Sequence, residues 1–297
     1  MLKPGPAPVL VAAGGTGGHL FPAEALAAAL RQRGIAVHLA TDRRAARFGA
    51  GFADESIHLV ASATIRARNP MALTRTVALL SLGVVQAWTL IGRLKPAAVI
   101  GFGGYPTIPP VLAAAWRGVP SLIHDANAVI GRANRLLAPR VTAIATTFPD
   151  VFAAEADLAA KATLTGNPVR AAVVAAAAIP YANPAAGDRL RLLVFGGSQG
   201  ARVMGEIVPA AIRRLDAALR GRLAVVQQAR EEDVSRVREA YAKLGVAADV
   251  APFFADLPAR MADSHLVISR SGASTVAELA AIGRPSILVP LPHAIDQ

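Results

Sequence analysis

The 297-residue chain has material for two domains, each with a hydrophobic core of its own. The absence of cysteine excludes disulfides, cysteine-ligated zinc and thiol catalysis. The chain has 31 Lys and Arg against 20 Asp and Glu, and the excess is concentrated in residues 1–165, with 16 basic and 8 acidic side chains. This charge favours a polyanionic partner. Because only 5% of residues are aromatic and no nucleic-acid-binding signature is present, we expect a phosphorylated substrate or an anionic membrane surface and no nucleic acid.

The first predicted elements are a strand, a glycine-rich turn and a helix. Residues 9–13 form a short apolar run typical of a buried strand, and an alanine- and leucine-rich run to Leu30 is typical of a helix. Between them lies Gly-Gly-Thr-Gly-Gly-His at 14–19. Glycines let a ligand approach the backbone, and the N–H groups at a helix start attract negative charge. The motif therefore predicts a site for a phosphate or diphosphate.

A long apolar segment follows a basic loop. The loop covers residues 61–70, and residues 77–94 are the most apolar stretch of the chain and are predicted to be helical. On a helix, Arg75, Gln86 and Arg93 share a narrow arc, which leaves a broad apolar surface. The helix either lies on an anionic bilayer or packs as an ordinary core helix, and the sequence leaves both interpretations open.

Three further strands are predicted at 97–102, 119–123 and 141–145. The first two are followed by Gly-Gly-Tyr and His-Asp-Ala-Asn. Because the carboxyl ends of parallel strands meet at one edge of a sheet, these residues and the first glycine motif are expected to face one crevice. The side chains placed there are Thr16, His19, Tyr105, His124 and Asn127. We expect His124 to be a hydrogen-bonded structural histidine, whereas His19, which opens a helix after a phosphate loop, is the candidate for chemistry.

The anion-site pattern recurs in the second half of the chain. After Gly-Asn-Pro-Val-Arg at 166–170 and a connector, an apolar run at 191–195 precedes Gly-Gly-Ser-Gln-Gly at 196–200. This motif begins 182 residues after the first and shares its pattern GG-[Thr/Ser]-x-G. The chain is therefore predicted to be an α/β protein with two Rossmann-like, doubly wound parallel-sheet domains, over residues 1–165 and 166–297.

The second half contains one more candidate site. Strands are predicted at 223–227, 248–252, 266–269 and 287–289. The third of these strands is followed by Arg-Ser-Gly-Ala-Ser-Thr and a helix carrying Glu278. The hydroxylated residues here are either N-caps or ligands of a phosphate or sugar. The sequence stops soon after the last predicted strand without a closing helix, so we expect this domain to be incomplete.

The motifs GGTGGH, GGY, HDAN, GNPVR, GGSQGAR, RSGAST-x-x-E and PHAIDQ, in this order, give the chain a resemblance to one family over essentially its whole length. The chain resembles the bacterial undecaprenyl-diphospho-muramoylpentapeptide β-N-acetylglucosaminyltransferases, which convert lipid I to lipid II in peptidoglycan synthesis. The resemblance implies a GT-B fold, with two domains facing across a cleft. It implies UDP-N-acetylglucosamine as the donor of the C-terminal half, lipid I as the acceptor of the N-terminal half, no cofactor, and a peripheral location on the cytoplasmic face of the inner membrane.

The same resemblance implies roles for particular residues. His19 is the implied general base. The residues implied near the acceptor diphosphate and the donor sugar are Thr16, Gly17, Gly18 and Asn127. The residues implied in the donor site are Arg170 and Ser198 at the nucleotide, Phe254 with its backbone at the uracil, Glu278 at the ribose, and Ala273, Ser274 and Thr275 along the diphosphate and sugar.

The chain departs from the family pattern at two places. It has His-Asp-Ala-Asn at 124–127 where the family often has His-Glu-Gln-Asn, and the family continues beyond Gln297, so the chain is expected to be truncated. The family's α-linked donor and β-linked product imply a single inverting displacement. Because the sequence contains no Asp-x-Asp motif, transfer is predicted to need no metal.

Three other functions remain compatible with parts of the sequence. The first is another UDP-sugar enzyme of the same fold, either a different lipid glycosyltransferase or an epimerase. The second is a nicotinamide-dependent oxidoreductase, against which the second glycine motif argues. The third is a non-catalytic scaffold that uses the basic and apolar surface of the first half at a membrane.

Overall fold

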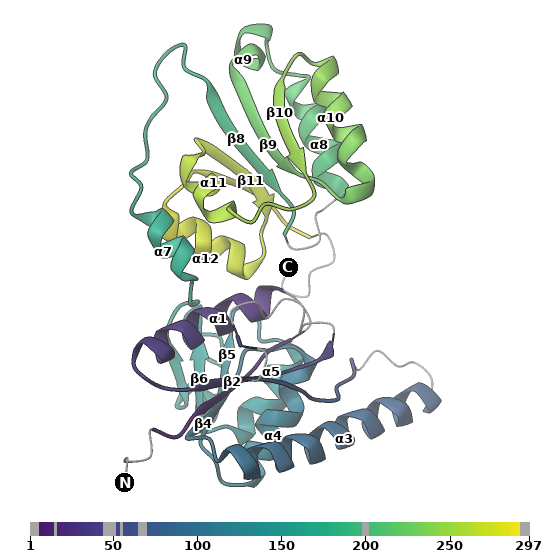
Figure 1. Ribbon diagram of the computed structural model, residues 1–297, viewed down its shortest axis with the longest axis vertical. Helices are drawn as coiled ribbons and strands as arrows, with labels where there is room; N and C mark the ends of the chain where they lie inside the picture. Colours follow the sequence, from purple (N-terminus) through teal and green to yellow (C-terminus); the bar gives the residue numbers. More distant parts are fainter. Residues whose placement is uncertain are drawn as a thin grey trace. The chain divides into compact units, whose positions relative to one another are not determined.

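The computed structural model describes residues 6–14, 17–43, 52–53, 56–64, 70–197 and 202–291. The chain forms two compact units, and the change from one to the other falls between Pro168 and Val169. Both units are built on a parallel sheet covered by helices, as Figure 1 shows, so the predicted α/β fold class is confirmed.

The N-terminal unit has a seven-stranded parallel sheet in the order β3-β2-β1-β4-β5-β6-β7. Its strands are β1 Val9–Ala12, β2 Val37–Thr41, β3 Ile57–Leu59, β4 Ala98–Gly101, β5 Ser121–Asp125, β6 Ala143–Thr146 and β7 Ala162–Leu164. Its main helices are α1 Gly17–Gln32, α3 Pro70–Leu94, α4 Ile108–Trp116 and α5 Arg132–Leu137, with α6 Ala156–Ala159 and the short helices Tyr105–Thr107 and Ala138–Arg140 between strands. The strand order reverses between β1 and β4, and ligands of open parallel sheets bind outside the carboxyl ends of the strands at such a point.

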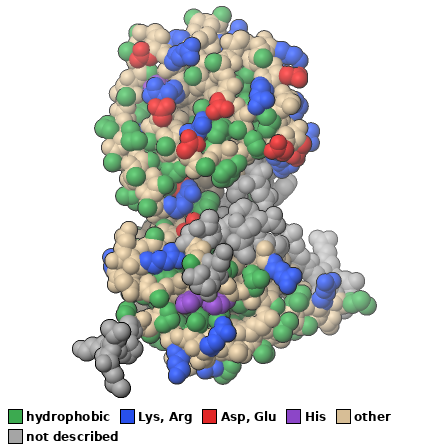
Figure 2. All heavy atoms as spheres, in the orientation of Figure 1, with side chains coloured by type: hydrophobic (Ala, Val, Ile, Leu, Met, Phe, Trp, Pro, Cys, Tyr) green, Lys and Arg blue, Asp and Glu red, His purple; other side chains and the backbone are tan. Residues whose placement is uncertain are grey.

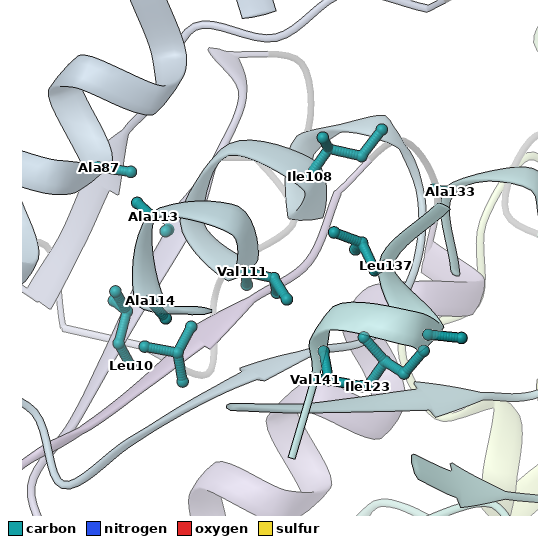
Figure 3. Close-up of a cluster of buried hydrophobic side chains, with 14 of the residues drawn as sticks. Leu10, Ala87, Ile108, Val111, Ala113, Ala114, Ile123, Ala133, Leu137 and Val141 are labelled. Atoms are coloured by element: carbon teal, nitrogen blue, oxygen red, sulfur yellow. The ribbon is translucent and has the colours of Figure 1, made fainter. Parts of the chain in front are cut away.

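Alternation along β1 sends side chains to two separate cores. Leu10 and Ala12 join the core under α3, α4 and α5, which Figure 3 shows in close-up. Val9 and Val11 join the core under α1, together with Leu20. Burial on both faces explains why this strand reads as a continuous apolar run.

Helix α3 packs closely along α4 at its centre (Figure 1). A Cβ added at Gly83 would overlap the carbonyl oxygen of Ala61 and lie 2.9 Å from Cγ of Pro109. Glycine at this position therefore lets the helix approach both the loop after β3 and the start of α4.

The C-terminal unit has a five-stranded parallel sheet in the order β10-β9-β8-β11-β12. Its strands are β8 Leu190–Phe195, β9 Leu223–Gln228, β10 Ala247–Ala251, β11 Leu266–Arg270 and β12 Ser286–Val289. Its helices are α7 Ala171–Ala177, α8 Arg202–Ile212, α9 Ala217–Arg222, α10 Val234–Lys243, α11 Leu257–Asp263 and α12 Ala273–Ile282, with the short helix Glu231–Asp233 before α10. One core lies under α8 and α10, and the other lies under α7, α11 and α12. As in the first unit, the strand that leads into the glycine motif lies inside the sheet, where the strand order reverses.

The structure differs from the sequence prediction at several element boundaries. Strands β3 and β7 were not predicted, because each is a three-residue edge strand without an apolar run. Strand β5 extends to Asp125, which places His124 and Asp125 inside the sheet instead of in the following loop. Helix α3 begins at Pro70, seven residues before the predicted apolar stretch.

Candidate active site

His19 lies in the first turn of α1, directly beyond the carboxyl end of β1. Its Nδ1 is 3.2 Å from the carbonyl oxygen of Gly14. A carbonyl oxygen only accepts hydrogen bonds, so Nδ1 carries the proton and Nε2 keeps its lone pair. Burial lowers the pKa of His19 below its ordinary value, partly opposed by the bond to Gly14 and by the charge of Asp125. At neutral pH His19 is therefore an uncharged imidazole that can accept a proton at Nε2.

The loop after β4 lies directly against this imidazole. Gly103 and Gly104 both have positive φ, at 93° and 78°. A Cβ added at Gly103 would lie 3.0 Å from the His19 ring, and one at Gly104 would lie 2.7 Å from the oxygen of Gly14. Only glycine combines this backbone with this close approach, so the Gly-Gly pair fixes the position of His19.

Asp125 organises the loop that carries Asn127. The carboxylate is buried, and it accepts hydrogen bonds from the backbone N–H groups of Asn127 and Gly131, each at 3.0 Å, and from the side-chain amide of Asn134 at 3.0 Å. Asn134 also donates to the backbone oxygen of His124, at 3.0 Å. The structure thus brings His19, Tyr105, His124 and Asn127 to the same edge of the sheet.

The sequence did not single out Asp125 as a polar centre of the site, and it did not single out Asn134 at all. The one local signal was the spacing Asp-x-Asn at 125–127, which is typical of a side chain that bonds the backbone two residues on.

His124 is almost completely buried, and its ring lies 5.3 Å from that of Phe102, centroid to centroid. Its Nε2 donates to the carbonyl oxygen of Gly166 at 3.0 Å. Burial lowers the pKa of His124, which keeps the ring uncharged. These contacts tie the end of β5 to the end of the N-terminal unit, as expected for a structural histidine.

The C-terminal unit carries a second group of predicted site residues at the start of α12. Gly272 is the N-cap of this helix and supplies no side-chain cap, and Ala273, Ser274 and Thr275 form its first turn. Glu278 follows one turn further on the same side of the helix, about 5 Å along the axis. Of the two alternatives for the hydroxylated residues, the N-cap interpretation is wrong, because the cap is a glycine. The N–H groups at the start of a helix favour an anion.

Arg170 and Glu278 form an ion pair across this site. Nε and Nη2 of Arg170 donate to the same carboxylate oxygen, Oε1, at 3.0 and 2.8 Å. The Glu278 side chain is 7% exposed and that of Arg170 is 26% exposed. Burial raises the pKa of Glu278, and the Arg170 guanidinium opposes that rise. The pair therefore holds a carboxylate in place where burial alone would favour its neutral form.

Phe254 lies under a polar network centred on Arg260 of α11. The guanidinium is 4.2 Å from the centre of the Phe254 ring. It donates to Asp256 from Nε and to Asp249 from Nη1, each at 2.9 Å. This network connects β10, the following loop and α11, and no pattern in the sequence predicted it.

Two predicted site residues, Thr16 and Ser198, lie outside the described residues, and Gly17 is described only as the first residue of α1. Gly18 and His19 follow it in the first turn of that helix. In the part of the chain that the structure describes, no group of three or more His, Asp or Glu side chains is arranged to hold a metal ion.

Two parallel-sheet α/β domains of this topology define the GT-B class of nucleotide-sugar enzymes. The chain matches the glycosyltransferase family 28 N-terminal domain over residues 9–146 and the glycosyltransferase family 28 C-terminal domain over residues 191–297. The chain belongs to glycosyltransferase family 28.

The chain is also similar to individual enzymes over almost its whole length. A UDP-N-acetylglucosamine–N-acetylmuramyl-(pentapeptide) pyrophosphoryl-undecaprenol N-acetylglucosamine transferase of Bradyrhizobium sp. (strain BTAi1) is 61% identical over 289 residues, covering 97% of this chain and 79% of the relative. The enzyme of the same name from Rhodopseudomonas palustris (strain CGA009) is 62% identical with the same coverage.

Solved structures show the same architecture. The crystal structure of Acinetobacter baumannii MurG has a TM-score of 0.72 at 29% identity, covering 97% of this chain and 79% of that one. UDP-GlcNAc 2-epimerase from Neisseria meningitidis has a TM-score of 0.63 at 14% identity, covering 94% of this chain and 81% of that one. The second likeness is one of fold alone.

Proposed function

We propose that this protein transfers N-acetylglucosamine from UDP-N-acetylglucosamine to the muramoyl 4-hydroxyl of undecaprenyl-diphospho-muramoylpentapeptide, converting lipid I to lipid II for peptidoglycan synthesis. The observation that carries the proposal is the 61% identity, over 97% of the chain, to an enzyme named for this transfer. The geometry of both units supports it, since each presents a helix N-terminus at the carboxyl edge of its sheet.

The donor belongs to the C-terminal unit. The first turn of α12 suits the diphosphate, and Glu278, one turn below, suits the ribose hydroxyls. This spacing matches a nucleoside diphosphate, in which the ribose follows directly on the phosphates. Phe254 is proposed to present its backbone to the uracil, and Arg170 and Ser198 are proposed to bind the nucleotide.

The acceptor belongs to the N-terminal unit, near Thr16, Gly17, Gly18 and Asn127. In a single displacement, the muramoyl 4-oxygen forms a bond to the anomeric carbon of the donor sugar as the bond from that carbon to the UDP oxygen breaks. Nε2 of His19 takes the hydroxyl proton, and the electron pair of the broken bond leaves with UDP. General-base catalysis of this kind contributes about 10²–10⁴-fold in rate. The helix N-terminus of α12 and Arg170 stabilise the charge that grows on the leaving diphosphate.

We also propose that the protein lies on the cytoplasmic face of the inner membrane as a peripheral protein, with α3 against the anionic surface. Helix α3 contains a 22-residue stretch, Leu73–Leu94, whose length and mean hydropathy of 1.6 would suffice to cross a membrane, and only 22% of its most apolar window is buried. Core helices meet the same criteria, so the argument rests on exposure. The apolar side chains exposed on α3 and on the adjacent end of α4 are Met71, Leu73, Val77, Leu82, Val85, Trp88 and Trp116.

Basic side chains accompany this apolar surface. The guanidinium of Arg117 lies 4.6 Å from the Trp88 ring centre, and Arg75 and Arg93 belong to α3 itself. On the face shown in Figure 2, hydrophobic and basic side chains cover the described surface around α3, and the acidic ones lie mainly on the C-terminal unit. An apolar stripe with basic neighbours suits an anionic lipid surface. Pelleting with liposomes tests this: binding to anionic vesicles and not to neutral ones is expected, and equal recovery with both would contradict it.

No cofactor or metal is part of this proposal, because the helix N-termini and Arg170 supply the positive field that a metal would otherwise provide. Transfer is therefore expected to proceed unchanged in the presence of EDTA, and no nucleic acid is expected to bind.

The proposed function is tested by UDP release with a lipid I analogue. Release that depends on the acceptor, with a β-linked disaccharide product, supports the transferase. Conversion of UDP-N-acetylglucosamine without an acceptor would indicate an epimerase, and liposome binding without turnover would indicate a scaffold. His19→Ala should lower kcat by about 10²–10⁴-fold with the KM for the donor nearly unchanged. Equal kcat in the variant and the parent would remove His19 from the role of base.

A further inference from the structure

The side chain of Arg170 is paired with a protein carboxylate. Both Nε and Nη2 donate to Oε1 of Glu278, at 3.0 and 2.8 Å, across 108 residues of sequence. The two groups belong to the same compact unit, since Arg170 follows Val169 at its start and Glu278 lies in α12. Helices α7 and α12 pack together, so the pair bridges two fixed elements.

The geometry of the pair leaves one carboxylate oxygen to other donors. The two bonds from Arg170 to Glu278 both end on Oε1, and within the described ranges no residue donates to Oε2, which leaves that oxygen for a ligand that donates hydrogen bonds. A single carboxylate held by a two-pronged guanidinium cannot rotate about its terminal torsion without losing both bonds. The orientation of Oε2 is therefore set by Arg170.

The protonation state of Glu278 also depends on Arg170. The carboxyl is 7% exposed, and burial raises its pKa, whereas the neighbouring guanidinium lowers it. Only the ionised form accepts hydrogen bonds at both oxygens. Without the guanidinium, a buried carboxyl would be less charged and free to turn, and both changes weaken it as an acceptor.

We propose that Arg170 is a positioning residue that acts on the donor through Glu278, by holding that carboxylate oriented to read the ribose hydroxyls of the nucleotide. The inference rests on the proposed function, in which Glu278 meets the ribose. This role is additional to the effect of the Arg170 charge on the diphosphate, and one measurable quantity separates the two, the preference for a ribonucleotide over its 2′-deoxy form.

The experiment measures binding of UDP and of 2′-deoxy-UDP by calorimetry, without acceptor. The parent protein should prefer UDP by about 10- to 100-fold, as expected for a hydrogen bond to a charged acceptor. Arg170→Gln should reduce this ratio most of the way to one, and Arg170→Lys, which keeps the charge, should restore part of it. Glu278→Gln should reduce it as far as Arg170→Gln does. In the double variant this ratio should be no lower than in Glu278→Gln alone, because one residue acts through the other.

A matched control is Arg191→Gln, which removes an arginine paired with a carboxylate, Asp263, at 3.3 Å elsewhere in the same unit. It should leave the ratio unchanged, and thermal melts should show that all variants are folded. The inference is overturned if Arg170→Gln weakens UDP and 2′-deoxy-UDP equally, or if its effect adds to that of Glu278→Gln. Neither outcome would contradict the proposed function. That proposal fails instead if the parent protein binds UDP but releases no UDP from UDP-N-acetylglucosamine in the presence of the acceptor.

Discussion

At the scale of single residues, His19, the proposed base, is positioned by a backbone carbonyl and by glycines more than by side chains. His19 donates from Nδ1 to Gly14, and a Cβ at Gly104 would lie 2.7 Å from that same carbonyl oxygen. The carbonyl of Gly14, the imidazole of His19 and the loop after β4 are therefore in direct contact with one another. A disturbance of the loop is expected to reach the reacting nitrogen.

Gly104→Ala tests this coupling. The added methyl group must displace either the loop or the carbonyl that orients His19, and a displacement of about 1 Å can cost about 10²-fold in rate. We expect kcat to fall by about that factor while the KM for UDP-N-acetylglucosamine stays within about twofold, since the donor residues belong to the other unit. Steady-state kinetics with a lipid I analogue measures both.

The control is Gly118→Ala, at a glycine with φ of 69° and nothing within 4 Å of the added Cβ. Both variants carry the backbone cost of alanine at positive φ, about 1 kcal/mol or more, and should lose similar thermal stability. Only Gly104→Ala should lose turnover. Full activity of Gly104→Ala would show that the loop does not position His19.

Residues of the site differ in how far the sequence could predict them. His19 and Glu278 belong to local patterns, a glycine turn or a hydroxylated turn at the start of a helix. The structure places His19 in the first turn of α1 and Glu278 one turn beyond the start of α12. The pairing of Arg170 with Glu278 spans 108 residues, and no local pattern encodes it. Asn134 was missed for a similar reason. Its partners, His124 and Asp125, lie on β5, 10 and 9 residues earlier in the chain, so no pattern within α5 indicates the contact.

At the scale of elements, α11 clamps the loop that holds Phe254. The guanidinium of Arg260 lies 4.2 Å from the Phe254 ring centre, and it donates to Asp256, the N-cap residue of α11, and to Asp249 on β10. The hydrogen bond from Arg260 holds the pKa of Asp256 below its ordinary value, so this carboxylate stays ionised and paired at neutral pH. Arg260 thus holds the loop through three contacts, with Phe254, Asp256 and Asp249.

Arg260→Ala should loosen this loop and weaken the proposed uracil site. The ion pairs are exposed and the stacking contributes modestly, so we expect the KM for UDP-N-acetylglucosamine to rise by about 3- to 10-fold, with kcat nearly unchanged. Arg135→Ala is a suitable comparison, since it removes an exposed arginine paired with Glu155 at 3.6 Å in the other unit. A KM for Arg260→Ala equal to that of the parent would show that the loop keeps its shape without the clamp.

Strands with a continuous apolar run were predicted from the sequence, whereas short strands that form only by pairing with a neighbouring strand were not. Strand β1 is buried on both faces and reads clearly as a strand. Strands β3 and β7 exist because they pair with β2 and β6 at the two edges of the sheet, and their own three-residue sequences carry no pattern. The first turns of α3 were missed because polar residues alternate there with apolar ones, and the helix is set by its packing on α4.

At the scale of the whole molecule, the same topology appears in both units. In each sheet the strand leading into a glycine motif has its neighbours on both sides, β2 and β4 beside β1, and β9 and β11 beside β8. The sequence predicted this repetition from two motifs 182 residues apart, because a strand, a glycine turn and a helix form a local unit. Burial of polar groups in these sheets, by contrast, appears only in the structure, and it determines how stability depends on pH.

Every histidine that the structure describes has a lowered pKa, with burial as the leading cause: His19, His38, His58, His124 and His265. Three of them, His265, His38 and His58, make hydrogen bonds that charging would break. His265 accepts the backbone N–H of Arg191 at Nδ1, at 3.0 Å. His38 and His58 face each other with 3.1 Å between Nδ1 and Nε2, beside the positive charge of Arg93. One proton can be shared between those nitrogens, but two cannot be accommodated.

The unfolded chain, with histidine pKa values near 6.5, therefore binds more protons than the folded one as the pH falls through that value. The free energy of unfolding should be highest above about pH 7 and should decrease as the pH falls below 6.5. Glu278 opposes this trend, because its pKa is raised in the folded chain, but it is a single group that takes up a single proton. Denaturant unfolding at intervals from pH 8 to pH 5.5 measures the slope. His38→Gln combined with His58→Gln should flatten it, because both groups then contribute no protons, and an unchanged slope in that variant would place the pH dependence elsewhere in the molecule.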